Sequence, residues 1–157
     1  MTTILVPPGK SEPLGVVFGA SLAGAGGRGS AEGMYSRADL SVRHPFALGA
    51  FTVSPRATVG GMNAFGGVAP RAEERWTHTG VGGLLEWPNA ARFRVCVGAD
   101  ALWAFGRGFE VDPEAGLVMD LSEGFILGVA LLRPFTFWDD ARIAGAGLGL
   151  IRIEWSP

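Results

Sequence analysis

Three polar side chains of this sequence could form a hydrolytic site: Ser54, His78 and Asp100. A tight turn at 88–91 would register its two flanking strands so that His78 and Asp100 share one face at similar height. Ser54, or Thr58, would lie on the strand before them. A hydroxyl, an imidazole and a carboxylate in contact can perform acyl transfer. A lone histidine bonded to a buried carboxylate is more commonly structural, so we expect no enzyme.

Other short motifs in the chain carry little chemistry. Residues 24–29 match the G-x-G-x-x-G pattern of dinucleotide-binding loops, but no crossover helix follows them, and we interpret them as a hairpin loop. The sequence contains no Walker A motif, no paired-cysteine zinc spacing and no His-x-x-x-His. We therefore predict no cofactor and no metal site.

Strict alternation of side-chain types places these residues on β-strands. Between Met34 and Arg43, charged and hydroxyl side chains occupy one parity and apolar side chains the other, and the pattern recurs over 51–59 and 93–105. Successive side chains of a strand point to opposite faces. Each strand thus has one apolar and one polar face, and we find no apolar stripe of helical period. The sequence predicts an all-β, antiparallel up-and-down barrel.

About eight strands are expected along the chain. They are 14–23, 34–43, 51–59, 75–87, 92–105, 124–131, a short segment 135–138, and 143–155. Long loops are predicted at 60–74 and at 106–122, where Asp112-Pro113 reads as a break. At 157 residues the chain fits one domain, 14–157, preceded by an extended arm, 1–13.

The composition suits a barrel with a polar interior. Hydrophobic residues make up 48% of the chain and charged residues only 18%, and twelve of the thirteen basic residues are arginine. Arginine favours confined ion pairs because its planar fork makes several hydrogen bonds at once, although a codon preference would give the same bias. The net charge of -2 indicates no affinity for nucleic acid. The lone Cys96 excludes an internal disulfide.

Loop lengths and aromatic positions indicate two different rims. Short connections are expected around Phe46, Asn89 and Arg133, and long ones around Gly27, Gly67 and Asp112. Aromatic side chains gather at strand ends, which is typical of the girdles of membrane barrels but also of strands in general. The predicted belts comprise Trp76, Trp87, Phe93, Trp103, Phe105, Trp138 and Trp155.

Taken together, residues 14–155 resemble the small eight-stranded outer-membrane β-barrel proteins of the OmpA and OmpX type. The resemblance rests on short turns opposite longer loops, on alternating strands, and on a last strand, 147–155, that ends in Trp155. It implies a partner in the lipid bilayer, a bacterial outer-membrane location, and a structural or interaction role through the longer loops. It also allows a lipid acyl hydrolase or transferase at Ser54, His78 and Asp100, as the less favoured reading.

Alternation alone does not fix which face is inside. In a membrane barrel the lumen would hold a polar network of Arg37, Asp39, Arg43, Arg56, Arg92, Arg94 and Asp100. In a soluble barrel, β-sandwich or jelly roll these residues would face water. Glycine, serine and threonine occupy the positions between the charges, and such small residues suit a cramped interior. We therefore favour the lumen, plugged by this network.

Two further functions stay open at this point. A soluble calycin-like or jelly-roll module would bind an apolar ligand among Phe18, Phe51, Val95, Val97, Trp103 and Phe125. The second of these functions is that of a structural subunit of a phage or similar assembly. Residues 1–8 lack the basic and apolar regions of a signal peptide, which keeps a cytoplasmic or virion location as the alternative. The sequence names no protein partner.

Overall fold

The computed structural model describes residues 15–26, 33–66, 74–89, 91–137 and 147–157, and every regular element in them is a strand. The strands are β1 (Val17–Gly26), β2 (Gly33–Arg43), β3 (Phe46–Leu48), β4 (Phe51–Gly66), β5 (Glu74–Trp87), β6 (Phe93–Ala104), β7 (Gly108–Ser122), β8 (Phe125–Leu132), β9 (Phe135–Thr136) and β10 (Leu148–Trp155). These residues include no helix long and apolar enough to cross a membrane. The predicted arm, 1–13, lies outside the described residues.

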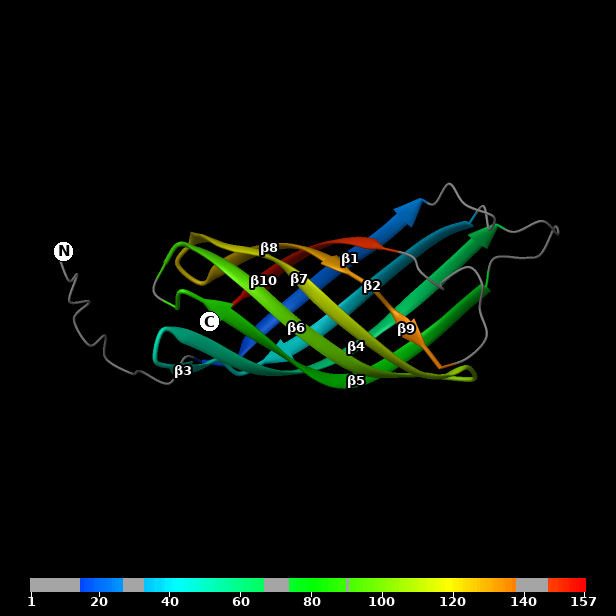
Figure 1. Ribbon diagram of the computed structural model, residues 1–157, viewed down its shortest axis with the longest axis horizontal. Helices are drawn as coiled ribbons and strands as arrows, with labels where there is room; N and C mark the ends of the chain where they lie inside the picture. Colours follow the sequence, from blue (N-terminus) through cyan, green and yellow to red (C-terminus); the bar gives the residue numbers. More distant parts are fainter. Residues whose placement is uncertain (1–14, 27–32, 67–73, 90, 138–146) are drawn as a thin grey trace.

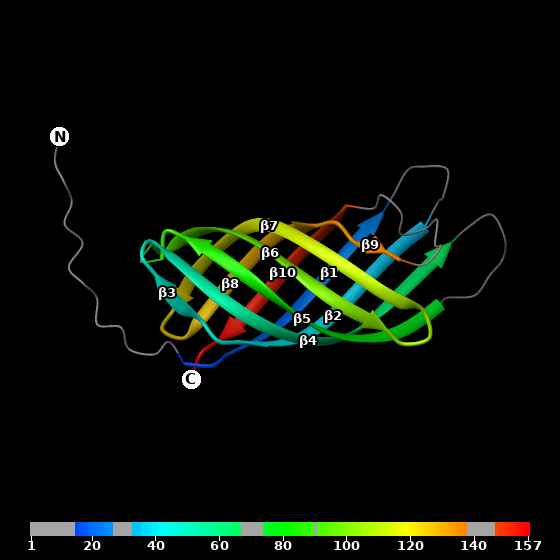
Figure 2. The same ribbon diagram turned by 60° about the horizontal axis from the view of Figure 1, so that its bottom comes forward.

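Eight of the strands close into an antiparallel barrel, and Figures 1 and 2 show the closed wall from two sides. Around the barrel the order is β1, β2, β4, β5, β6, β7, β8 and β10, and the pairing of β10 with β1 completes the ring. The short strands β3 and β9 add to the ends of β4 and β7. The predicted fold class is confirmed, and closure leaves no exposed sheet edge along the wall.

The strand registers fix the width of the barrel. Arg37 on β2 is connected to Thr52 on β4 by a row of registered partners. The row passes through one residue on each of β1, β10, β8, β7, β6 and β5. Extrapolated beyond its last pair, Arg43 with Arg56, the β2–β4 register places Thr52 opposite position 47, past the end of β2 and ten residues from the start. Such a stagger tilts the strands by roughly 35–45° and leaves a bore that side chains fill. Figure 1 shows the tilt.

The second half of the barrel differs from the predicted strands. The segment 106–122, expected as a loop, is mostly β7, and 135–138 contributes only the two residues of β9, which pair with β7 instead of closing the ring. Likewise β4 continues to Gly66 through much of the loop predicted at 60–74. The tight connections in this half are therefore at 105–107 and 123–124, and Arg133 begins a long one. The predicted alternation of short and long loops holds only in the first half.

Pro113 was mistaken for a break although it lies on a strand, and Pro55, inside the predicted strand 51–59, has the same geometry. Pro55 lies on β4 between Val53, which pairs with β3, and Arg56, which pairs with β2. On β7, Pro113 lies between Val111, which pairs with β9, and Glu114, which pairs with β8. Each proline therefore occupies a point where the neighbouring strand changes, so its missing N–H removes no hydrogen bond from a continuous ladder.

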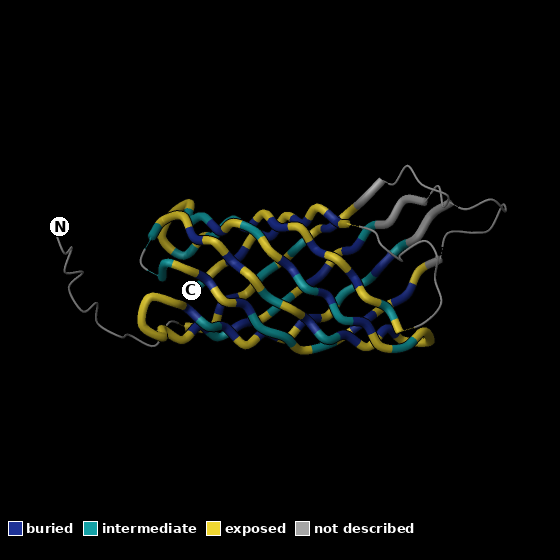
Figure 3. Tube along the Cα trace, viewed as in Figure 1, coloured by how far each residue is buried: buried dark blue, intermediate teal, exposed yellow. Residues whose placement is uncertain are grey.

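Buried and exposed residues alternate along the strands of the wall (Figure 3). On β10, Leu148, Leu150, Arg152 and Glu154 are buried, while the residues between them are exposed. Arg43 is 3% exposed, whereas Leu131 is 72% exposed. The apolar residues proposed to enclose a ligand in a soluble module are likewise all exposed on the outer wall, so that pocket is not formed: Phe18, Phe51, Val95, Val97, Trp103 and Phe125.

Glycines on the inner face make room for the charged groups. A methyl group built on Gly60 would overlap Asp39 and lie 2.8 Å from Nε2 of His78, and one on Gly82 would overlap Asp100. The outward-facing neighbour Gly61 meets nothing nearer than a carbonyl oxygen at 3.9 Å. Inward glycines are therefore part of the packing of the lumen, because the carboxylates occupy the space that a side chain would need.

The pair Gly60 and Gly61 provides a matched test of this packing. Gly60→Ala is expected to destabilise the folded barrel by about 1–3 kcal/mol, because the methyl group forces apart groups that are already in contact. Gly61→Ala should cost far less, since its methyl group points away from the lumen. Urea titration of both variants in detergent measures the difference, and equal midpoints would contradict the assigned faces.

Candidate functional site

A continuous chain of ion pairs begins at the end of the barrel that carries the 123–124 turn, called here the turn end. Asp120 receives two hydrogen bonds from Arg94, both 2.7 Å long. Arg94 also donates to Glu86 at 2.8 Å, and the other oxygen of Glu86 lies 2.9 Å from Arg43. Arg43 then donates to Glu154 at 2.7 and 3.1 Å and to the hydroxyl of Ser54 at 2.8 Å. Arginine and carboxylate therefore alternate from the first step.

The same chain continues into the middle of the lumen. Arg152 lies 3.8 Å from Glu154 and donates to Glu114 at 2.6 and 2.8 Å. Glu114 also accepts from Arg56 at 3.0 Å, and Arg56 reaches Asp100 at 2.8 Å. The nine groups come from β2, β4, β5, β6, β7 and β10. The chain therefore crosses the lumen repeatedly and joins strands that are not neighbours in the sheet.

The alternation of arginine and carboxylate groups along the chain offsets the cost of burying their charges. Removing a charge from water costs several kcal/mol, and a partner offsets this only where geometry is good and the remaining lone pairs are satisfied. In the middle of the chain each arginine touches two carboxylates, and Glu114 accepts from two arginines. Charge-assisted bonds of this kind are short and strong in a medium of low dielectric constant.

A second cluster occupies the opposite end, called here the loop end. Arg37 on β2 donates to Asp39 at 2.5 Å and to Asp112, and lies 3.7 Å from Glu110. Nε2 of His78 is 2.7 Å from Asp39. Between the two clusters lies a void of about 10 Å³ lined mainly by polar side chains, which is room for about one water molecule.

Apolar layers and the two clusters together close the bore. Leu84, Cys96 and Val118 pack together near the turn end, with Ile126 against them. A second group fills the lumen toward the loop end: Ala23, Met62, Trp76, Ala104, Ala130, Leu132, Leu148 and Leu150. The described side chains therefore fill much of the bore, as expected of an eight-stranded barrel.

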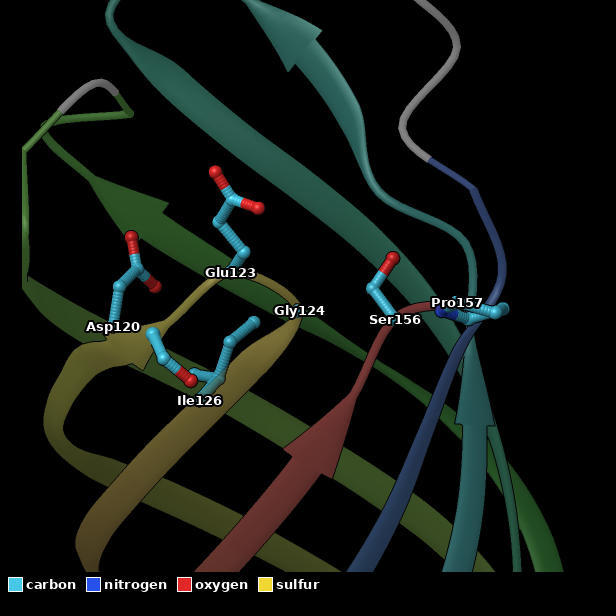
Figure 4. A pocket seen from close by; sticks show the side chains of 7 residues that line it. Asp120, Glu123, Gly124, Ile126, Ser156 and Pro157 are labelled. Carbon is cyan, nitrogen blue, oxygen red and sulfur yellow. The ribbon is translucent and has the colours of Figure 1, made fainter.

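An open depression lies at the mouth of the turn end, as Figure 4 shows. Its volume is about 740 Å³, and Asp120, Glu123, Ile126 and Ser156 are among the residues that line it. The backbone N–H of Ser156 donates to the carbonyl of Gly124 at 2.8 Å, which holds the end of β10 to the β7–β8 turn. Asp120 is engaged by Arg94, so the depression is the outer end of the ion-pair chain.

Six of the seven predicted lumen residues lie inside the barrel. Arg37, Asp39, Arg43, Arg56, Arg94 and Asp100 are all buried, and each takes part in one of the two clusters. Arg92 does not belong with them, because it is exposed and donates to the backbone carbonyl of Asp120 at 3.1 Å. It precedes β6, which begins at Phe93, so the alternation of the strand does not orient it.

The proposed hydrolytic triad is not assembled. The register pairs His78 with Ala104, and Asp100 with Gly82, so the two residues lie at different heights. His78 contacts Asp39, Asp100 contacts Arg56 and Thr58, and Ser54 accepts from Arg43. In the described ranges no group of three or more His, Cys, Asp or Glu residues could hold a metal ion.

Five of the seven predicted belt aromatics are exposed on the outer wall: Trp87, Phe93, Trp103, Phe105 and Trp155. Trp76 instead points inward with 7% exposure, because it shares the parity of His78 on β5, and Trp138 lies outside the described residues. Phe135 pairs with Val111 at the loop end, where Phe109 and Phe137 pack together. Exposed aromatics therefore occur at both ends of the barrel.

The prediction from sequence missed seven charged residues of the network: Glu86, Glu110, Asp112, Glu114, Asp120, Arg152 and Glu154. A signal was present on β7, where Glu110, Asp112 and Glu114 alternate with less polar neighbours in strand period. It was hidden by Pro113, which favoured a loop. Arg152 and Glu154 alternate with isoleucines in the same way on β10.

Comparison with known proteins places the fold but no family. No family model and no curated protein matches the chain. A solved structure described as "De novo design of transmembrane beta-barrels" matches with a TM-score of 0.55 and 12% identity, over 93% of this chain and 98% of that chain. At that identity the likeness shows the barrel architecture alone.

Glu114 offers the sharpest test of the ion-pair chain, because it bridges Arg56 and Arg152. Glu114→Gln leaves two buried guanidinium groups short of charge and is expected to destabilise the fold by about 3–5 kcal/mol. Glu123→Gln, in the exposed β7–β8 turn, should change stability by less than about 0.5 kcal/mol. Equal unfolding midpoints for the two variants would show that the chain contributes little.

Proposed function

We propose that the protein is an integral outer-membrane barrel without catalytic activity, which acts as a structural element or binds partners through its ends. The observation that carries the proposal is the inverted polarity of the barrel. Leucine, valine and isoleucine cover the outer wall on every side, with Leu22, Leu40, Val81 and Ile151 each more than half exposed. Burial of apolar surface contributes about 25 cal/mol per Å², so such a wall is stable only against lipid or another apolar surface.

The aromatic residues at the two ends support a bilayer as that apolar surface. At the turn end Phe18, Phe125 and Trp155 lie in one registered row, with Trp87 and Phe93 on the strands opposite. Trp103 and Phe109 are registered neighbours at the loop end. Aromatic girdles above and below an apolar band are the arrangement of transmembrane barrels, because their rings favour the lipid headgroup level.

The lumen supports a role other than a channel. Ion pairs and apolar layers fill it, and an eight-stranded barrel leaves no room beside its own side chains. The resemblance to OmpA and OmpX type barrels supports the bacterial outer membrane as the location and the two ends as the parts that meet partners. A virion subunit would need protein contacts over the whole apolar wall, and it remains the second candidate.

The presence of a bilayer around the wall is tested directly by comparing the cost of an arginine at two heights on the outer face. Leu40→Arg places a charge at the middle of the outer wall, and we expect it to destabilise the barrel in phospholipid vesicles by about 2–4 kcal/mol. Leu121→Arg, on the outer face at the end of β7, should cost about 0–1 kcal/mol. Denaturant titrations in vesicles and in detergent-free buffer measure the change in stability that each substitution causes. A monodisperse protein in plain buffer, with equal effects of the two substitutions, would contradict the membrane proposal.

Sealed vesicles test the plugged lumen separately. Vesicles that hold a small fluorescent dye should keep it after the folded barrel is inserted, because ion pairs and apolar side chains fill the narrow bore of an eight-stranded barrel. Dye release at the rate of a porin would contradict the closed lumen while leaving the membrane location intact.

A further inference from the structure

The loop-end cluster holds more negative than positive charge. It contains three carboxylates, Asp39, Glu110 and Asp112, against Arg37 and His78. Ionised carboxylates would outnumber the cations by two if His78 is neutral, and by one if it is charged. Among the described residues, then, at least one carboxylate lacks a counter-charge whichever form the histidine takes. The ion-pair chain differs, since its one surplus carboxylate, Asp120, lies at the partly exposed mouth.

Atoms without hydrogen-bond partners gather at this same end. Five buried side-chain atoms in the described ranges have none, and four of them are Oε1 of Glu110, Oδ1 of Asp112, Nδ1 of His78 and Nε1 of Trp76. The fifth, Oε1 of Glu86, is 2.9 Å from Arg43. Glu110 and Asp112 are each only 1% exposed. A buried carboxylate that stays ionised needs several donors, so these oxygens point to a missing positive partner.

The groups around Glu110 supply no such partner. On β2 it faces Arg37, which already serves Asp39 and Asp112, and on its own strand it faces Asp112. Its registered neighbours are Leu102 on β6 and Thr136 on β9. His78 on β5 is engaged with Asp39, while Arg56 on β4 and Arg152 on β10 are held by Glu114. Every basic side chain that the described strands bring into the lumen is thus committed elsewhere or shared.

We propose that the adjacent carboxyl groups of Glu110 and Asp112 form a proton-binding site, with Glu110 carrying the proton at neutral pH. A protonated carboxyl can donate one hydrogen bond, while Asp112 keeps its contact with Arg37. A proton can bind to these carboxyl groups because, unlike a larger cation, it needs no cavity. A metal ion is less suited, because the described residues offer no set of three ligands. The proposal concerns the lumen alone and holds whether or not lipid surrounds the barrel.

Two glutamates on β7, four residues apart, allow a matched experiment. Glutamine mimics a protonated glutamate, so Glu110→Gln should leave the urea midpoint at neutral pH unchanged, whereas Glu114→Gln should lower it clearly. Infrared spectroscopy of the folded wild type should show the carbonyl band of a protonated carboxylic acid, absent in Glu110→Gln and retained in Glu123→Gln. Because the folded state holds a proton that the unfolded chain releases, wild-type stability should fall as pH rises, and less so in Glu110→Gln.

Three results would overturn the proposal. The first is a wild type without the carboxylic acid band at neutral pH, which requires no variant to fold. Another is a Glu110→Gln midpoint lowered as far as that of Glu114→Gln, which would show an ionised and well-partnered Glu110. The last is a midpoint that rises with added sodium or potassium chloride in the wild type but not in Glu110→Gln, which would assign the site to a metal cation instead.

Discussion

Pairing of arginine with carboxylate inside a closed sheet is the interaction on which this structure depends. Hydrogen bonding around the ring satisfies the backbone, but it does not decide which face of the wall turns inward. The ion pairs decide it, because Arg43, Arg56 and Arg152 each find two carboxylates across the lumen. With the charges enclosed, the apolar faces have nowhere to point except outward.

The narrow bore and the small inner residues follow from the same constraint. A barrel of this stagger is just wide enough for side chains, so long charged groups fit only where their neighbours are small. Gly60 lies beneath the pair formed by Asp39 and His78, and Gly82 lies beneath Asp100. The glycines of the inner face thus provide part of the space that the ion pairs occupy.

Period-two alternation was enough to predict a closed antiparallel sheet and about half of its inner charges, because that signal is local. It failed where long-range pairing overrides local preference. Pro113 reads as a break, yet it stands where β7 changes partner, so the strand runs through it with Glu110, Asp112 and Glu114 facing inward. The partner of His78 was also unpredictable, since contact with Asp39 depends on the stagger of the whole barrel and not on one turn.

Proton nuclear magnetic resonance contacts between methyl groups and detergent acyl chains test the central claim most directly. The account predicts such contacts for the outward methyl groups of Val97, Leu131 and Ile151, and none for the inward methyl groups of Leu84, Leu102 and Leu150. Contacts from the inward set, or outward methyl groups that contact water instead of detergent, would contradict it.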